Sequence, residues 1–169
     1  MNPMKTIRIE KITLNIGAGK DQNKLEKARL LLKKITGLEP VKTYTKKRIP
    51  GWGLRPGLAI GCKITLRKGS AIELLKRLVD AKDKTLLQSQ FDEKGNISFG
   101  IHEYIDIEGA KYDPKIGIIG LQACVTLERP GYRIKRRSTK TTRVSKKHCI
   151  SKEEAIDYMK EQFNISIGE

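Results

Sequence analysis

Cysteines, long apolar runs and aromatic side chains are all scarce in this chain of 169 residues. The three cysteines, Cys62, Cys124 and Cys149, are odd in number and far apart, which argues against a disulfide framework and favours a reducing compartment. No apolar run approaches the roughly 18 residues that span a bilayer. The segment from Met1 to Lys5 lacks the apolar stretch of a secretory signal. We therefore expect a cytoplasmic protein with no membrane contact.

Side chains for catalysis or metal binding do not occur in a recognised arrangement either. The chain has no Cys-x-x-Cys pair, and His148 and Cys149 are neighbours rather than spaced as a chelating pair. His102 and Glu103 are adjacent as well, so on a strand their side chains would point to opposite faces. A single histidine with no nucleophile is not a catalytic site. The sequence predicts no enzyme, no metal and no cofactor.

A short glycine-containing turn leaves one enzymatic alternative open. Gly17 to Lys20 lies between a predicted strand and a predicted helix, as a phosphate-binding loop does. However, Asp21 follows where a Walker motif has Ser or Thr, and no third glycine completes a dinucleotide motif. An ordinary tight turn is the favoured interpretation, and a nucleotide-binding enzyme is the alternative.

Acidic residues are missing from two long windows. The chain has 35 Lys and Arg against 19 Asp and Glu, a formal net charge of +16. Eight basic residues and no acid lie between Pro40 and Ile72, and nine basic residues and no acid lie between Arg129 and Lys147. The rest of the chain is nearly neutral. Solubility alone favours mixed signs, so we expect both windows to face a polyanion, foremost nucleic acid. A solvated basic surface is the alternative.

Hydrophobic periodicity predicts an α+β fold for residues 1–169 as a single domain. Apolar alternation and helical spacing mark the elements in the order β-α-β-β-α-β-β-α. The predicted strands are 7–16, 41–45, 60–66, 97–101 and 119–127, the last being the longest, and the predicted helices are 21–36, 70–79 and 151–163. This order is typical of a mostly antiparallel sheet with its helices on one face.

Three local signals refine these elements. A phase slip at Glu10-Lys11 predicts a β-bulge in the first strand. Ser70 with Glu73 predicts a capping box at the start of the second helix. The same spacing in Ser151 and Glu154 predicts a capping box for the last helix.

The sheet face opposite the helices is expected to be polar and partly basic. Its candidate RNA-binding side chains are Lys11, Thr13, Asn15, Lys63, Thr65 and Arg67. Later strands add Ser98, Gly100, His102, Gln122 and Thr126 to this face. No aromatic residue occurs at these positions, which disfavours stacking of single-stranded RNA. Short hydroxyl and amide side chains suit the 2′-hydroxyls and base edges of an RNA minor groove, and a merely solvated face is the alternative.

Two irregular segments carry most of the excess charge. Residues 46–57, called the basic loop below, are predicted to be flexible and contain the only Trp. Its candidate contacts are Lys47, Arg48, Trp52 and Arg55. The sequence leaves open whether Trp52 faces nucleic acid or folds back onto the core. Residues 129–149, the basic arm, precede the last helix and are irregular by composition. Its candidate phosphate contacts are Arg129, Arg133, Lys135, Arg136, Arg137, Lys140, Arg143, Lys146 and Lys147.

Several motifs together resemble one family. The segments 9–17 (IEKITLNIG), 60–67 (IGCKITLR) and 95–101 (GNISFGI) are similar to motifs of the L5 family of large-subunit ribosomal proteins. The segments 129–133 (RPGYR) and 147–151 (KHCIS) resemble its archaeal and eukaryotic branch. The match covers essentially the whole chain in order.

The resemblance implies a structural role in RNA assembly. Members of the family bind 5S rRNA and help to anchor it to 23S rRNA in the central protuberance, beside other proteins of that region. The family's contacts to 5S rRNA fall on Asn15 and Thr65, and its loop that reaches toward the P-site tRNA falls on 48–57. The family also bridges to a protein of the small-subunit head, to which we assign no residues. Bacterial members lack the segment 131–149, so the resemblance implies no particular partner for it. A free-standing regulatory RNA-binding protein is the alternative.

Overall fold

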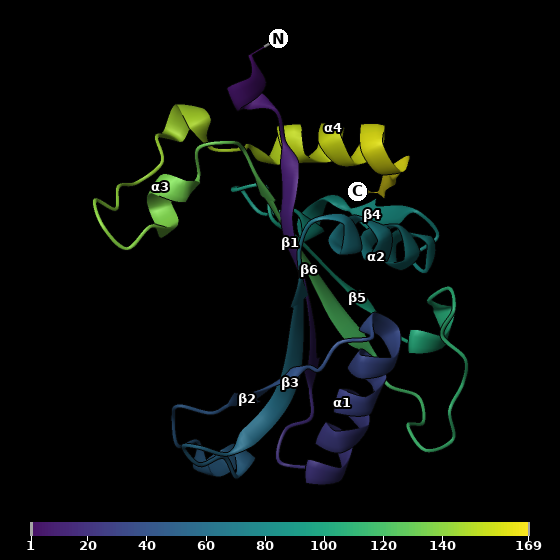
Figure 1. The fold of residues 1–169 in the computed structure, drawn as a ribbon. Coiled ribbons are helices and arrows are strands. Elements are labelled where there is room, and N and C mark those ends of the chain that lie inside the picture. The colour runs from purple at the N-terminus through teal and green to yellow at the C-terminus, as the bar shows by residue number, and fades with distance from the viewer. Residues whose placement is uncertain (1, 169) are drawn as a thin grey trace.

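An antiparallel sheet forms the centre of the protein (Figure 1). The computed structural model describes residues 2–168, and within them the sheet has five strands in the order β2-β3-β1-β6-β5. All four neighbouring pairs are antiparallel, which confirms the mostly antiparallel sheet expected. The strands are β1 (Arg8–Gly17), β2 (Val41–Tyr44), β3 (Ala59–Leu66), β5 (Ile97–Ile101) and β6 (Leu121–Glu128).

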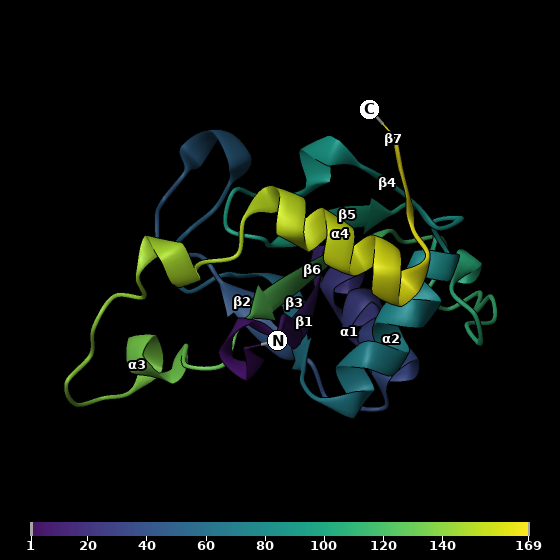
Figure 2. The ribbon, with the colours of Figure 1, turned by 90° about the horizontal axis from the view of Figure 1, so that it is seen from above.

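Two helices cover one face of this sheet, and a third lies across its end. α1 (Gln22–Thr36) and α2 (Gly69–Asp80) pack on the same side, while α4 (Lys152–Phe163) crosses the end of the sheet (Figures 1 and 2). Leucines of α1 and α2 and the alternate apolar residues of the strands join one buried cluster, to which α4 contributes Ala155 and Met159. The α+β fold is therefore confirmed.

β1 is the longest strand at ten residues, so the prediction that 119–127 would be the longest is wrong. β6 begins only at Leu121, because its partner β5 ends at Ile101, the residue that pairs with Leu121. The bulge predicted in β1 is confirmed, since the register with β6 shifts between Ile9 and Lys11. Glu10 is the inserted residue.

One of the two predicted capping boxes is wrong. At α4, the Ser151 hydroxyl accepts from the Glu154 backbone N–H at 3.3 Å, and the Glu154 carboxylate accepts from the Ser151 N–H at 3.0 Å. At α2, Ser70 already lies inside the helix, whose cap is Lys68 and has no side-chain hydrogen bond. Lys68 adopts φ 60°, and its carbonyl accepts from Ala71 and Ile72.

Short elements form in segments for which the periodicity of the sequence predicts no regular structure. β4 (Thr85–Leu87) pairs in parallel with β7 (Ser166–Gly168) at the C-terminus, and three residues are too few for an alternation to be noticed. The basic arm, expected to be irregular, contains the one-turn helix α3 (Arg133–Arg136). A 3-10 turn also forms in the basic loop at Pro50–Trp52.

Candidate nucleic-acid interface

The sheet register aligns the predicted polar side chains in rows on the face opposite α1 and α2. Asn15 of β1 lies opposite Lys63 of β3 and Gln122 of β6. The next row joins Thr13 to Thr65, whose hydroxyl oxygens are 3.4 Å apart. These side chains are exposed or half-buried, while the intervening residues of the same strands are buried. Alternation along each strand thus produces a continuous polar face.

Charged side chains lie at both ends of this polar face, with Lys63 in the row of Asn15 at one end and the following residues at the other. Lys11 lies opposite Thr126, and Arg67 follows the last residue of β3 and is exposed. Arg8 and Glu128 are cross-strand partners where β6 ends. The charge pattern of the sequence does not indicate this last pair, because Glu128 directly precedes the basic window and its partner Arg8 lies far away in the sequence.

Cys124 lies at the centre of the polar face, between Thr13 and Ser98 of the neighbouring strands. Burial raises the pKa of its thiol, so the group is neutral at physiological pH. Cys124 is not among the polar residues that the sequence predicts for this face. A neutral thiol leaves the middle of the face without charge.

The basic loop is a hydrogen-bonded connection between β2 and β3. The Thr45 hydroxyl donates to the Arg55 carbonyl at 2.7 Å, and Ile49 and Leu54 bond to each other through their backbones. Leu54 is buried and fixes the loop from inside. Trp52 is 71% exposed, so it does not fold back onto the core. Within residues 2–168, the three basic candidates of the loop form no ion pair; they are Lys47, Arg48 and Arg55.

Most cations of the basic arm are exposed and form no ion pair within residues 2–168, whereas two of its arginines are engaged in contacts within the protein. Exposed candidates are Arg133, Lys135, Arg137, Lys140, Arg143, Lys146 and Lys147. Arg129 is only 5% exposed, and its guanidinium donates to Glu154 at 2.6 Å and to the Cys149 carbonyl at 3.3 Å. Arg136 is ion-paired with Glu10 and Glu128. These two arginines hold the arm on the body of the protein, a role that the charge count alone does not reveal.

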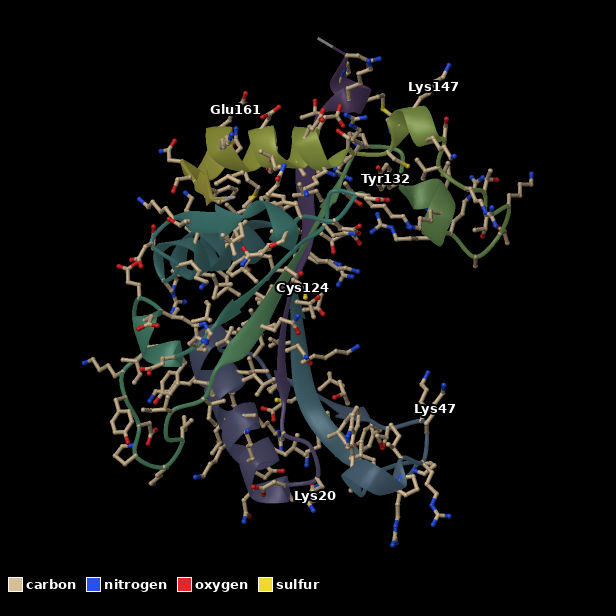
Figure 3. The ribbon with its side chains drawn as sticks, turned by 180° about the vertical axis from the view of Figure 1, so that it is seen from behind. Lys20, Lys47, Cys124, Tyr132, Lys147 and Glu161 are labelled. Atoms are coloured by element: carbon tan, nitrogen blue, oxygen red, sulfur yellow. The ribbon has the colours of Figure 1, made fainter. Side chains whose placement is uncertain are left out.

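The arm and the loop project to the same side of the sheet, away from α1 and α2 (Figures 1 and 2). Seen from behind, Cys124 lies between Lys47 of the loop and Tyr132 of the arm (Figure 3). The polar face is therefore flanked by a basic segment at each end. Two windows that are remote in sequence contribute their charge to one surface.

The turn at Gly17 to Lys20 has its central amides occupied within the protein. The backbone N–H groups of Ala18 and Gly19 donate to the Ile60 carbonyl at 2.8 and 3.0 Å. The Asp21 carboxylate caps α1 by accepting from Asn23 and Lys24. A carboxylate therefore already occupies the helix end that would bind an anion.

Residues 2–168 contain neither a candidate metal site nor a candidate membrane-spanning helix. No group of three or more His, Cys, Asp or Glu side chains gathers as metal ligands would. None of the described helices combines the length and the apolar composition needed to cross a bilayer.

Together, the fold and this surface define a basic α+β protein with a polar sheet face between two basic projections. Comparison with known families identifies it further. A model described as ribosomal protein L5 matches residues 2–55, and a second model, for the C-terminus of the same ribosomal family, matches residues 59–158. The chain belongs to the L5 family of ribosomal proteins.

Archaeal proteins with the name "Large ribosomal subunit protein uL5" are similar along the whole chain. The protein from Nanoarchaeum equitans is 51% identical over 98% of this chain and 98% of its own length. The protein from Sulfurisphaera tokodaii is 45% identical over 100% of this chain and 96% of its own length. The protein from Methanobrevibacter smithii is 44% identical over 98% of this chain and 98% of its own length. The motifs predict the archaeal and eukaryotic branch of the family, and these archaeal relatives confirm that prediction. The chain is a structural, cytoplasmic component of the ribosome and not an enzyme, so the alternative of a nucleotide-binding enzyme is wrong.

Proposed function

We propose that this protein binds 5S rRNA through the polar face and helps to anchor it to 23S rRNA in the central protuberance of the large subunit. The contacts of the polar face are Lys11, Thr13, Asn15, Lys63, Thr65 and Arg67. The observation that carries the proposal is their alignment in cross-strand rows between two acid-free projections. The exposed cations of the basic arm contact rRNA phosphates.

The side-chain sizes fit recognition of an RNA helix by shape. Short Thr and Asn side chains let the sheet approach a wide, shallow minor groove, where 2′-hydroxyls both donate and accept hydrogen bonds. Lysine and arginine at the ends of the face reach the phosphates on either side. Recognition thus lies in the centre of the polar face, and charge neutralisation at its ends.

The basic loop reaches toward the P-site tRNA in this proposal. Exposure of Trp52 on a hydrogen-bonded scaffold supports contact with a nucleic-acid backbone or a base. Lys47, Arg48 and Arg55 lie exposed beside it to neutralise phosphates. Neighbouring proteins of the central protuberance and a protein of the small-subunit head complete the set of partners.

Two measurements test the proposal. Purified protein should bind 5S rRNA saturably and more tightly than an unrelated RNA hairpin of equal length. In a sucrose gradient of cell lysate, the protein should sediment with the large subunit. Binding of 5S rRNA no tighter than binding of the hairpin would contradict the assignment of the polar face to 5S rRNA.

A further inference from the structure

Two carboxylates lie beside the basic arm, on the side that faces RNA in the proposed function. Glu128 is the last residue of β6 and Glu10 is the bulge residue of β1. Carboxylates on such a surface repel phosphate and would weaken RNA binding. The contacts that these two residues make indicate a structural contribution. Both are largely buried, with side chains 6% and 13% exposed.

An ion-pair network uses both oxygens of Glu128. Its Oε1 accepts from Arg8 Nε at 2.9 Å and lies 2.7 Å from Arg8 Nη2, and its Oε2 accepts from Arg136 Nη2 at 2.6 Å. The other terminal nitrogen of Arg136 donates to Glu10. One guanidinium of the arm therefore bridges two carboxylates on neighbouring strands.

The local backbone explains why these groups meet. The bulge inserts Glu10 between two paired residues of β1, so its carboxylate comes beside that of Glu128. Arg136 is the last residue of α3, and the short helix is thereby fixed to the end of the sheet. A helix of four residues has no stability of its own, so its order depends on contacts of this kind.

A second set of contacts closes the base of the arm. The Tyr132 hydroxyl donates to the His148 carbonyl at 3.2 Å, and the His148 ring bonds to the Pro130 carbonyl at 2.8 Å. Arg129 joins this base to Glu154 of α4. The ends of the arm are thus tied together, and Arg136 holds its middle to the sheet.

We propose that Glu10 and Glu128 are positioning residues that order the basic arm before RNA binds. The inference rests on the proposed function, because it assigns the arm's order to the same RNA-binding surface. Arg136 gives its charge to the carboxylates and not to RNA, and in return the neighbouring cations are held in one arrangement. The entropy of ordering the arm is then lost on folding and not on binding.

The test compares two double variants of equal charge. Glu10→Gln with Glu128→Gln breaks the network, while Asp157→Asn with Glu161→Gln removes two exposed carboxylates from α4, where Glu161 points away from the sheet (Figure 3). Simple electrostatics predicts tighter binding of 5S rRNA by both variants. We expect the first variant to bind about threefold to tenfold more weakly than the second.

Amide hydrogen exchange of the free protein gives the independent measurement. Exchange in residues 130–148 should become about tenfold faster or more in the network variant and stay unchanged in the α4 variant. If the network variant does not fold, Arg136→Gln removes the same contact and leaves Glu128 paired with Arg8.

Either of two results overturns the inference. One is unchanged exchange in the arm when the network is broken. The other is binding of 5S rRNA by the network variant as tight as by the α4 variant. If the wild-type protein itself does not bind 5S rRNA, the proposed function is wrong, and hydrogen exchange alone then decides whether the two carboxylates order the arm.

Discussion

At the scale of single residues, Arg129 and Arg133 show that the charge pattern of the sequence does not distinguish a buried arginine from an exposed one. Both belong to the same acid-free window, and the sequence treats them alike. Arg133 is exposed, whereas Arg129 is buried against carbonyls and Glu154. Composition predicts where positive charge gathers along the chain. The burial of the Arg129 side chain depends on α4, which is distant in the sequence and supplies Glu154. The sequence of this window contains no signal of that packing.

Substituting these two arginines should separate folding from binding. Arg129→Ala should lower the free energy of unfolding by about 2–4 kcal/mol, because it removes a buried guanidinium and leaves its acceptors unpaired. Arg133→Ala should change stability by less than about 0.5 kcal/mol and weaken RNA binding. Urea unfolding and a 5S rRNA binding titration measure the two effects. Equal loss of stability in both variants would contradict the assignment.

Unlike Arg129, Asn15 and Thr65 of the polar face should affect RNA binding and leave stability nearly unchanged. Changing both to Ala removes two hydrogen-bonding groups, so binding of 5S rRNA should weaken by about tenfold. The melting temperature should change little, because the one side-chain hydrogen bond that either makes within residues 2–168 is the 3.4 Å approach between Thr13 and Thr65.

A double Ala variant at Thr6 and Asn23 is the matched control. Both residues are exposed and lie outside the polar face. Binding by this control should equal that of the wild type. If the variant at positions 15 and 65 unfolds instead, those residues are structural, and their assignment as RNA contacts is wrong.

At the scale of elements, the two Ser-x-x-Glu segments show where local sequence suffices. Ser151 and Glu154 cap α4 as predicted, and Glu154 is also the partner of Arg129. Ser70 and Glu73 have the same spacing, but α2 begins one residue earlier than Ser70. The turn after β3 decides that start, because Lys68 adopts a positive φ that directs its carbonyl to the first turn. Such a backbone conformation is not predictable from the residue type.

The cap of α4 should make stability depend on pH. The hydrogen bond from the Ser151 backbone, together with Arg129, holds the pKa of Glu154 below its usual value. A lowered pKa in the folded state stabilises the protein above the ordinary Glu value of about 4.3, and this stabilisation is lost as the pH falls. The variant Glu154→Gln lacks the ionised carboxylate and therefore its stabilisation. Its melting temperature should lie below that of the wild type near pH 7.

The difference between the two melting temperatures should shrink as the pH falls from about 5 to about 3. Other carboxyls with lowered pKa values, such as Asp92 and Asp113, titrate in both proteins and cancel in the comparison. A difference that stays constant across this range would mean that Glu154 contributes nothing through its charge.

At the scale of the whole molecule, the two acid-free segments lie far apart in the sequence but project to the same side of the sheet. Periodicity predicts which residues of a single strand share a face. It does not state which strand ends lie together or to which side a connection projects. The strand order β2-β3-β1-β6-β5 and the projection of the arm and loop decide this. Long-range packing therefore supplies what the sequence pattern could not.

This arrangement predicts a steep dependence of RNA binding on salt. Each phosphate neutralised by Lys or Arg releases counterions, so affinity falls as a power of the salt concentration. If the arm and the ends of the polar face neutralise several phosphates together, affinity for 5S rRNA should fall by about two orders of magnitude or more between about 50 and 200 mM salt.

The slope of that titration also assigns charge to particular segments. Changing both Arg137 and Arg143 to Ala should reduce the slope of log affinity against log salt by about 1–2, because two phosphate contacts are lost. Changing Lys76 and Lys160 to Ala, two exposed lysines on α2 and α4, should leave the slope unchanged. A flat titration of the wild type would contradict binding through phosphates. An equal decrease in both variants would mean that the positive charge acts as a diffuse property of the molecule, without the directed surface that the arm, the polar face and the loop form.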